Sequence, residues 1–83
     1  MIPTIHLNGT GKESLLDALT AASVALDLAY EALKQTAPNG RDYYPQGPGA
    51  LEKAIEEHDA RLRAIDSVKN EIDEMTCVIA DLP

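Results

Sequence analysis

The side chains best suited to binding chemistry lie in the segment that joins two long helix-forming stretches. Arg41 offers a planar guanidinium that suits a phosphate or carboxylate, and Tyr43 and Tyr44 offer stacking faces and hydroxyls. Gln46 adds an amide that can read polar edges. These side chains predict a site for a nucleotide-like molecule. The structural alternative is that one tyrosine fills the open end of a helix pair, while Arg41 pairs with Asp42 or with a helix C-terminal carbonyl.

The N-terminal residues supply two further candidate ligand-binding side chains, His6 and Asn8. Apolar and polar residues alternate from Thr4 to Leu7, as they do in an extended segment. An arm of this kind cannot be stable alone. We expect it to lie across a helix or to pair with the same arm of another subunit, so that the arm and the loop together form pockets between subunits.

The run from Asn8 to Ser14 has some similarity to a phosphate-binding loop but lacks its key residues. Such a loop needs glycine where His6 stands, and serine or threonine where Glu13 follows the lysine. No buried strand precedes it either. The sequence therefore argues against nucleotide hydrolysis.

The remaining chemistry-bearing residues do not form a recognisable catalytic or metal-binding set. A Glu-x-x-His metal motif ending at His58 would need a carboxylate where Ile55 stands, and His6 is far away in sequence. We interpret His58 as hydrogen-bonded at a helix interface, where it could make assembly sensitive to pH. Cys77 is the only cysteine, and we expect a buried, inert thiol. No nucleophile–base pair is visible, so we expect a non-enzymatic protein without a metal or cofactor.

The composition of the chain limits which kinds of molecule it can bind. The chain has 83 residues, no Phe or Trp, and a net charge of -7, so we expect a single domain with a thin core. The acidic balance opposes binding to nucleic acid or to anionic membranes, although a small anion can still bind near Arg41. No secretory signal or membrane-length apolar run is present, and we expect a cytoplasmic protein.

The stretch 12–37 predicts a helix with more than one apolar face. One face carries the larger residues, a second is rich in alanine, and only a narrow stripe is polar. A single partner helix covers one side, so this excess predicts a homo-oligomer. The first face holds Leu15, Leu19, Ala22, Leu26, Ala29, Tyr30 and Leu33; the second holds Leu16, Ala21, Ala25, Leu28 and Ala32; the stripe holds Asp17, Thr20, Asp27, Glu31 and Lys34.

The stretch 50–81 predicts a second, longer helix of about 45 Å. Thr10 and Glu13 match a capping box at the start of the first helix, and Asn39-Gly40 predicts a left-handed cap or turn after it. The apolar stripe of the second helix holds Leu51, Ile55, His58, Leu62, Ile65, Val68, Ile72, Met75, Ile79 and Leu82; its charged face holds Glu56, Asp59, Arg63, Asp66, Glu71, Asp73 and Glu74.

These elements predict an all-α fold, an antiparallel two-helix hairpin with a short extended N-terminal arm, assembled as a homo-oligomer. The single domain 1–83 divides into an arm (1–11), a first helix (12–37), a loop (38–49) and a second helix (50–81). The C-terminal turns predict a subunit interface, built from Met75, Val78, Ile79 and Leu82.

Three segments of the chain resemble a family of small phage and prophage proteins of uncharacterised role: Ile5 to Thr10, Asn39 to Pro48, and Glu57-His58 with Arg61-Leu62. More loosely, an acidic helical hairpin of this length is similar in architecture to phage sponge proteins that sequester the cyclic nucleotides of CBASS or Thoeris immunity. The second resemblance implies an oligomer that binds its ligand without cleaving it, and it transfers no individual residue.

Two functional hypotheses follow. The first is a phage-type anti-defence protein that sequesters a small phosphorylated signal, such as a cyclic nucleotide or an ADP-ribose-type ligand, in pockets between subunits. The alternative is an acidic helical inhibitor or assembly factor, whose charged face occupies a basic site on a host or phage protein.

Overall fold

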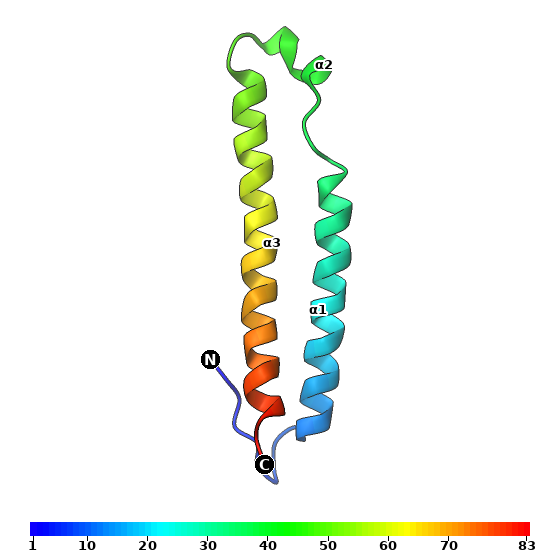
Figure 1. Ribbon diagram of the computed structural model, residues 1–83, viewed down its shortest axis with the longest axis vertical. Coiled ribbons are helices and arrows are strands. Elements are labelled where there is room, and N and C mark those ends of the chain that lie inside the picture. The colour runs from blue at the N-terminus through cyan, green and yellow to red at the C-terminus, as the bar shows by residue number, and fades with distance from the viewer.

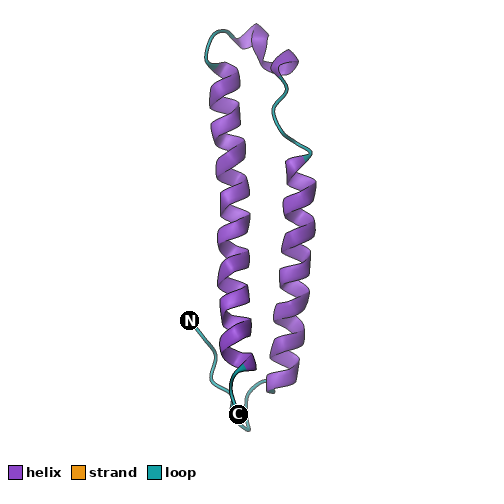
Figure 2. Cartoon of the chain, in the orientation of Figure 1, coloured by secondary structure: helices purple, strands orange, loops and turns teal.

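The computed structural model describes all 83 residues and contains helices only. Two long helices, α1 (Lys12–Lys34) and α3 (Ala50–Ala80), lie side by side and run in opposite directions (Figure 1). The short helices α2 (Gly40–Tyr43) and η1 (Tyr44–Gln46) connect them at one end of the molecule. No strand is present (Figure 2). The all-α prediction is confirmed.

The molecule is a rod that measures 61 × 19 × 19 Å. Two helices in contact bury only the sides that face each other, and only Ala54, His58 and Ile79 are buried. Ile79 is the one large side chain with no exposed surface. The core is therefore a narrow seam between two helices, as expected for a chain of this length.

The seam between α1 and α3 is lined by leucines and isoleucines at helical spacing. Two residues assigned to the apolar stripe of α3 lie at its margins instead, with Ile55 41% and Val68 46% exposed. One partner helix is too narrow to cover the whole stripe. The half-buried seam residues are Leu15, Leu19, Leu26, Tyr30 and Leu33 of α1, and Leu51, Leu62, Ile65 and Ile72 of α3.

Helix α1 begins without the capping box that the sequence suggests. Its N-cap is Gly11, and no side chain accepts a hydrogen bond from the free amides there. Lys12 instead ties the start of α1 to the end of α3. Its Nζ donates hydrogen bonds to the carbonyl oxygens of Ala80, at 3.2 Å, and Leu82. The bond to Ala80 satisfies a carbonyl that the last turn of α3 leaves free.

Helix α1 ends at Lys34 rather than at Ala37. The next residues form tighter turns, with the Thr36 amide donating to the Leu33 carbonyl at 3.0 Å and the Thr36 hydroxyl to the same oxygen at 2.7 Å. Pro38 disfavours a helical conformation at the preceding residue. The helix therefore closes before the proline.

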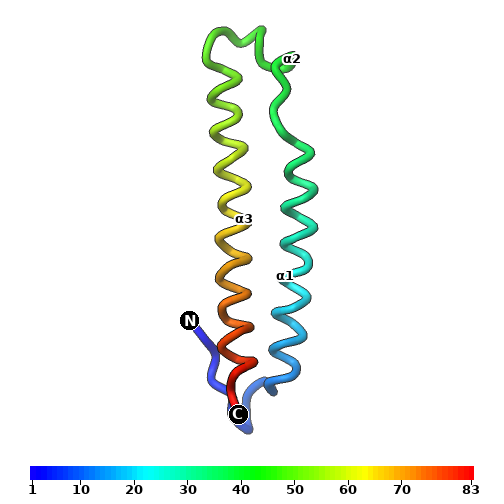
Figure 3. Tube along the Cα trace, in the orientation of Figure 1, coloured from blue at the N-terminus to red at the C-terminus, as the bar shows by residue number.

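Residues 1–11 form no regular secondary structure. Figure 3 traces them alongside the C-terminal end of α3 and then around a turn into α1, where the Gly9 amide donates to the His6 carbonyl at 3.2 Å. Ile2 and Ile5 line a pocket of about 410 Å³ together with Val78 and Leu82. The surface that we expected to meet another subunit thus lies against the chain's own N-terminal residues.

Candidate ligand-binding site

The connection between the long helices is more ordered than a loop. The Asn39 side chain caps α2 by accepting a hydrogen bond from the Arg41 amide at 2.9 Å. Of the left-handed cap or turn predicted at Asn39-Gly40, the turn is present, with the Asp42 amide donating to the Asn39 carbonyl at 2.9 Å. Neither residue is left-handed, because Asn39 has a φ of -106° and positive φ occurs only at Gly47 (100°) and Gly49 (84°). Glycine tolerates that region without a steric penalty, so these two residues direct the chain into α3.

A pocket of about 290 Å³ lies where this connection meets the first turns of α3. The segment after α1 forms one wall, η1 and its neighbours form another, and α3 forms the floor. Backbone turns hold each wall, so the pocket does not depend on a disordered loop. Its lining residues are Thr36, Pro38, Tyr43, Gln46, Ala50, Lys53, Ala54, Glu57 and Arg61.

The pocket carries a local positive excess on an acidic chain. Lys53 and Arg61 outnumber its one carboxylate, Glu57. An ion pair joins Arg61 Nη2 to Glu57 Oε2 at 3.6 Å, whereas Lys53 forms no ion pair. Because nearby groups determine the field in a pocket, this end of the rod can attract an anion despite the net charge of -7.

The predicted loop residues divide between the pocket and the surface. Tyr43 is half-buried and lines the pocket together with Gln46. Tyr44 is 78% exposed. Arg41 is exposed, lies outside the pocket lining and forms no ion pair with Asp42. One tyrosine therefore packs at the open end of the helix pair and the other is free to meet a ligand or partner.

Within one chain, His6 and Asn8 do not join these residues. They belong to the N-terminal segment, which lies at the opposite end of the rod from α2 (Figure 1). The His6 ring packs over the backbone of Gly9, where an added Cβ would come within 2.7 Å of Nε2. A pocket that combines loop and arm residues would need two copies of the chain.

Lys53 and Arg61 are not among the binding residues that the sequence predicts. Neither residue belongs to the apolar stripe or to the charged face that the sequence predicts for this helix. Lys53, Glu57 and Arg61 follow one another at steps of four, which places them on one side of α3, next to the apolar stripe. Only the folded connection shows that this side is partly enclosed.

His58 follows the pocket-lining Glu57 on α3 but does not line the pocket, and it is only 5% exposed. Its Nδ1 atom is buried and has no hydrogen-bond partner. The expected hydrogen bond at this ring nitrogen is therefore absent, although the buried interface position agrees with a packing role. Buried polar atoms of this kind are uncommon, because removing one from water without a partner costs free energy.

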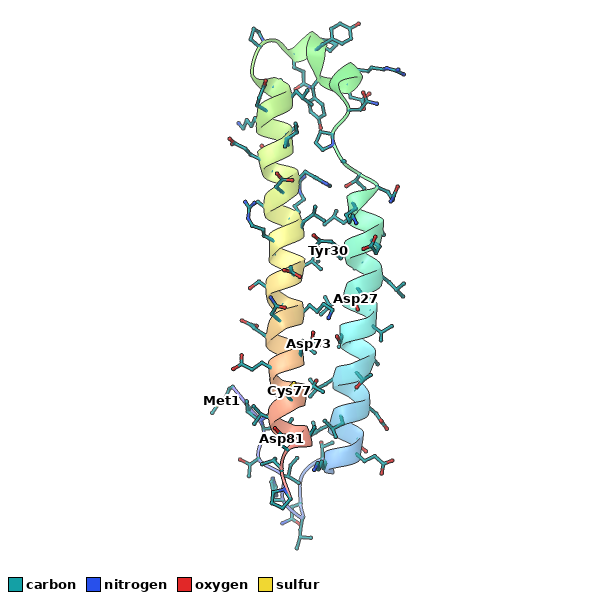
Figure 4. All side chains as sticks on the ribbon, viewed as in Figure 1. Met1, Asp27, Tyr30, Asp73, Cys77 and Asp81 are labelled. Carbon is teal, nitrogen blue, oxygen red and sulfur yellow. The ribbon has the colours of Figure 1, made fainter.

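A polar cluster crosses the seam near the middle of the helix pair, where Asp27 and Asp73 face each other from α1 and α3 (Figure 4). Lys69 Nζ lies 2.7 Å from Asp73 Oδ2 and 3.6 Å from Asp27 Oδ1. The Ser23 hydroxyl donates to Asp73 Oδ1 at 2.6 Å. Asp73 was assigned to the outer charged face, and that assignment is wrong, because its side chain bonds across the seam.

These contacts shift the ionisation of two groups in opposite directions. The hydrogen bond from Lys69, followed by that from Ser23, lowers the pKa of Asp73. The hydrogen bond to Asp73 raises the pKa of Lys69, against the opposing effect of desolvation. Both charged forms are therefore favoured in the folded chain.

Cys77 does not have the buried position expected for it, since its residue is exposed. It lies on α3, two residues before Ile79. No three His, Cys, Asp or Glu side chains gather in a way that would hold a metal ion. No helix of the chain has both the length and the apolar character needed to cross a membrane.

The chain is therefore an acidic, all-α helix pair. It has a locally cationic pocket at the end where α2 and η1 connect the two long helices. Searches of protein-family models, curated proteins and solved structures find no match to this chain.

Proposed function

We propose that this chain is a non-enzymatic binding protein that sequesters a small phosphorylated, nucleotide-type signal in the cytoplasm. In this proposal it acts as a phage-type anti-defence protein, a helical hairpin with an N-terminal arm that works as a homo-oligomer. The observation that carries the proposal is the pocket where Lys53 and Arg61 meet Tyr43 and Gln46. The architectural resemblance to phage sponge proteins supports the same class of ligand.

Each group in the pocket has a chemical role in this proposal. Lys53 and Arg61 bind phosphate oxygens, because hydrogen bonds between charged groups are stronger than those between neutral groups. Tyr43 stacks on a base and Gln46 reads its polar edge. The exposed Arg41 and Tyr44, at the same end of the rod, contact the ligand from outside the pocket.

Calorimetry against cyclic dinucleotides, cyclic trinucleotides and cyclic ADP-ribose isomers tests the proposal. We expect Lys53→Ala and Arg61→Ala each to weaken binding roughly tenfold or more, since a hydrogen bond to a charged group contributes about 1.5–3 kcal/mol. Arg63→Ala is the matched control, because Arg63 is an exposed cation of α3 outside this pocket. The proposal is abandoned if no compound in the panel binds.

The outer face of α3 supports a second candidate function, binding to a basic site on a host or phage protein. Five acidic side chains remain exposed there without an ion pair: Glu56, Asp59, Asp66, Glu71 and Glu74. A stoichiometric protein partner that is lost after charge reversal of Glu56, Asp59 and Asp66, and retained by Lys53→Ala and Arg41→Ala, would favour this function over ligand binding.

A further inference from the structure

We propose that a second copy of this chain packs antiparallel on the face of α1 that points away from α3, and that this pairing brings the second copy's N-terminal segment to the candidate pocket. The packing part of the proposal stands on the surface of α1. Only its consequence for the ligand rests on the proposed function.

The outward face of α1 carries no charge. At 100° per residue, the charged side chains of α1 fall within less than half of the helix circumference, on an arc between the side that faces the seam and the outward face. The outward face is exposed and apolar, and its largest side chain, Leu28, is 67% exposed. The residues that form this outward face are Ser14, Ala18, Ala21, Ala25, Leu28 and Ala32.

The spacing of this outward face suits a helix of the same sequence. Its residues follow one another at alternating steps of four and three, which is the seam pattern of paired helices. When two such seams run antiparallel, Leu28 lies opposite Ala18 of the second copy and Ala21 lies opposite its Ala25. The one large side chain therefore meets a small one on both sides of the two-fold axis, and alanines elsewhere permit close approach.

The distribution of charge favours a second copy over other occupants. Asp17 and Glu31 border the outward face, so an anionic lipid surface is repelled. A basic protein is attracted to the exposed carboxylates of α3 rather than to an uncharged face. Two chains of net charge -7 can approach through α1 while their acidic α3 faces stay far apart.

Antiparallel pairing in this register has a consequence for the pocket. Helical rise places Lys12 of the second copy level with Lys34, the last residue of α1. The segment that precedes Lys12 in the second copy therefore lies beyond Lys34, at the end of the rod where Thr36 and Pro38 lie. Thr36 and Pro38 form a wall of the candidate pocket. The pairing thus brings His6 and Asn8, which lie at the far end of their own chain, to the end where Tyr43 and Gln46 lie.

The size of the contact predicts a reversible dimer. The outward face runs for about 27 Å along α1. Two such strips bury less than the roughly 1,200 Å² at the lower limit of standard stable interfaces. The mass measured by light scattering should therefore rise from monomer to dimer as the protein concentration increases. A mass that stays monomeric up to millimolar protein would overturn the proposal.

Substitutions on α1 locate the contact. We expect Ala25→Glu and Leu28→Asp each to raise the dimer dissociation constant about tenfold or more. Thr20→Glu is the matched control, because Thr20 is an exposed residue of the same helix outside the outward face, and it should leave dimerisation unchanged. Circular dichroism on each variant verifies that the helices persist. Equal dimerisation of all three variants would contradict the proposed face.

Cysteine pairing fixes the orientation in a Cys77→Ser background. When Ala18→Cys and Leu28→Cys proteins are mixed and oxidised, antiparallel pairing predicts the mixed disulfide as the main product. Parallel pairing predicts that each protein bonds to itself, and this outcome would overturn the orientation. Both readouts use ligand-free protein, so they can succeed when no nucleotide binds. Binding that persists in a monomeric Ala25→Glu variant would instead refute only the shared pocket.

Discussion

The Ser23–Asp73–Lys69–Asp27 cluster shows how single polar residues bond across an otherwise apolar seam. Lys69 is the central group, with a side chain only 24% exposed and carboxylates of both helices within ion-pair distance. A lysine in this position fixes the register of α1 on α3, because a one-turn slip would separate it from Asp27. The cluster therefore contributes specificity as well as stability.

The pKa shifts of this cluster predict how folding stability changes with pH. Asp73 has a lowered pKa, so its contribution is present above the ordinary aspartate pKa of about 3.9 and is lost as the pH falls through the folded-state value. Lys69 has a raised pKa, so its contribution is complete below about pH 10.4 and is lost as the pH rises through the folded-state value.

Urea unfolding of Asp73→Asn from pH 2 to 7 measures the acid side of this prediction. We expect the variant to be less stable than the parent at neutral pH, and the difference to shrink below about pH 4. Glu74→Gln is the control, since Glu74 is exposed and forms no ion pair. An equal effect of both substitutions at all pH values would show that the contacts of Asp73 contribute nothing specific.

His58 leads to a different prediction, because its Nδ1 atom is buried without a hydrogen-bond partner. Replacing such a group by an apolar one of similar size removes a desolvation penalty. We expect His58→Leu to unfold at equal or higher denaturant concentration, with a gain of up to about 1 kcal/mol. A clear loss of stability would mean that the ring makes a bond essential to the fold.

The two long helices both have glycine at the N-cap, but the backbone conformations of these two glycines differ. Gly11 caps α1 with a φ of -66° and a ψ of 154°, and a Cβ added there meets no atom within 4 Å. Gly49 caps α3 with a φ of 84°, a region that other residues rarely adopt. The two glycines look alike in sequence, but only one of them is required by the backbone.

Two substitutions separate these roles. We expect Gly11→Ser to stabilise the chain by a few tenths of a kcal/mol, because a serine oxygen can accept from the free amides of the first turn. We expect Gly49→Ala to destabilise it by about 1–2 kcal/mol through the left-handed backbone. Thermal unfolding followed by circular dichroism compares them, and shifts of the same sign would contradict this assignment.

At the scale of the whole molecule, stability depends on very few buried side chains. Ile79, in the last turn of α3, is fully buried. We expect Ile79→Ala to cost about 2–4 kcal/mol, a large share of what a small domain has. Val68→Ala, at a 46% exposed position, should change the stability of the monomer by less than about 1 kcal/mol. Similar losses for both would mean that the seam is not the core.

Much of the fold is determined locally and could be predicted. The apolar spacing from Leu15 to Leu33 and from Leu51 to Ile79 predicts which sides of the two helices are buried. Residues three or four positions apart lie on the same side of a helix, so a repeat at this spacing marks one face. Proline and glycine likewise predict where the helices must stop. The excess apolar surface of α1 was also visible, and Leu28 is indeed exposed in the single chain.

The tertiary structure decided what depends on contacts between distant residues. It placed Asp73 in the seam, tied Lys12 to the end of α3, exposed Cys77, and laid residues 1–5 over the turns expected to meet another subunit. It also gave Lys53 and Arg61 a role beside Tyr43, while His6 and Asn8 lie at the other end. The spacing of residues along one helix shows which face of the helix they occupy. Which residues share a pocket depends on the path of the chain that connects the helices.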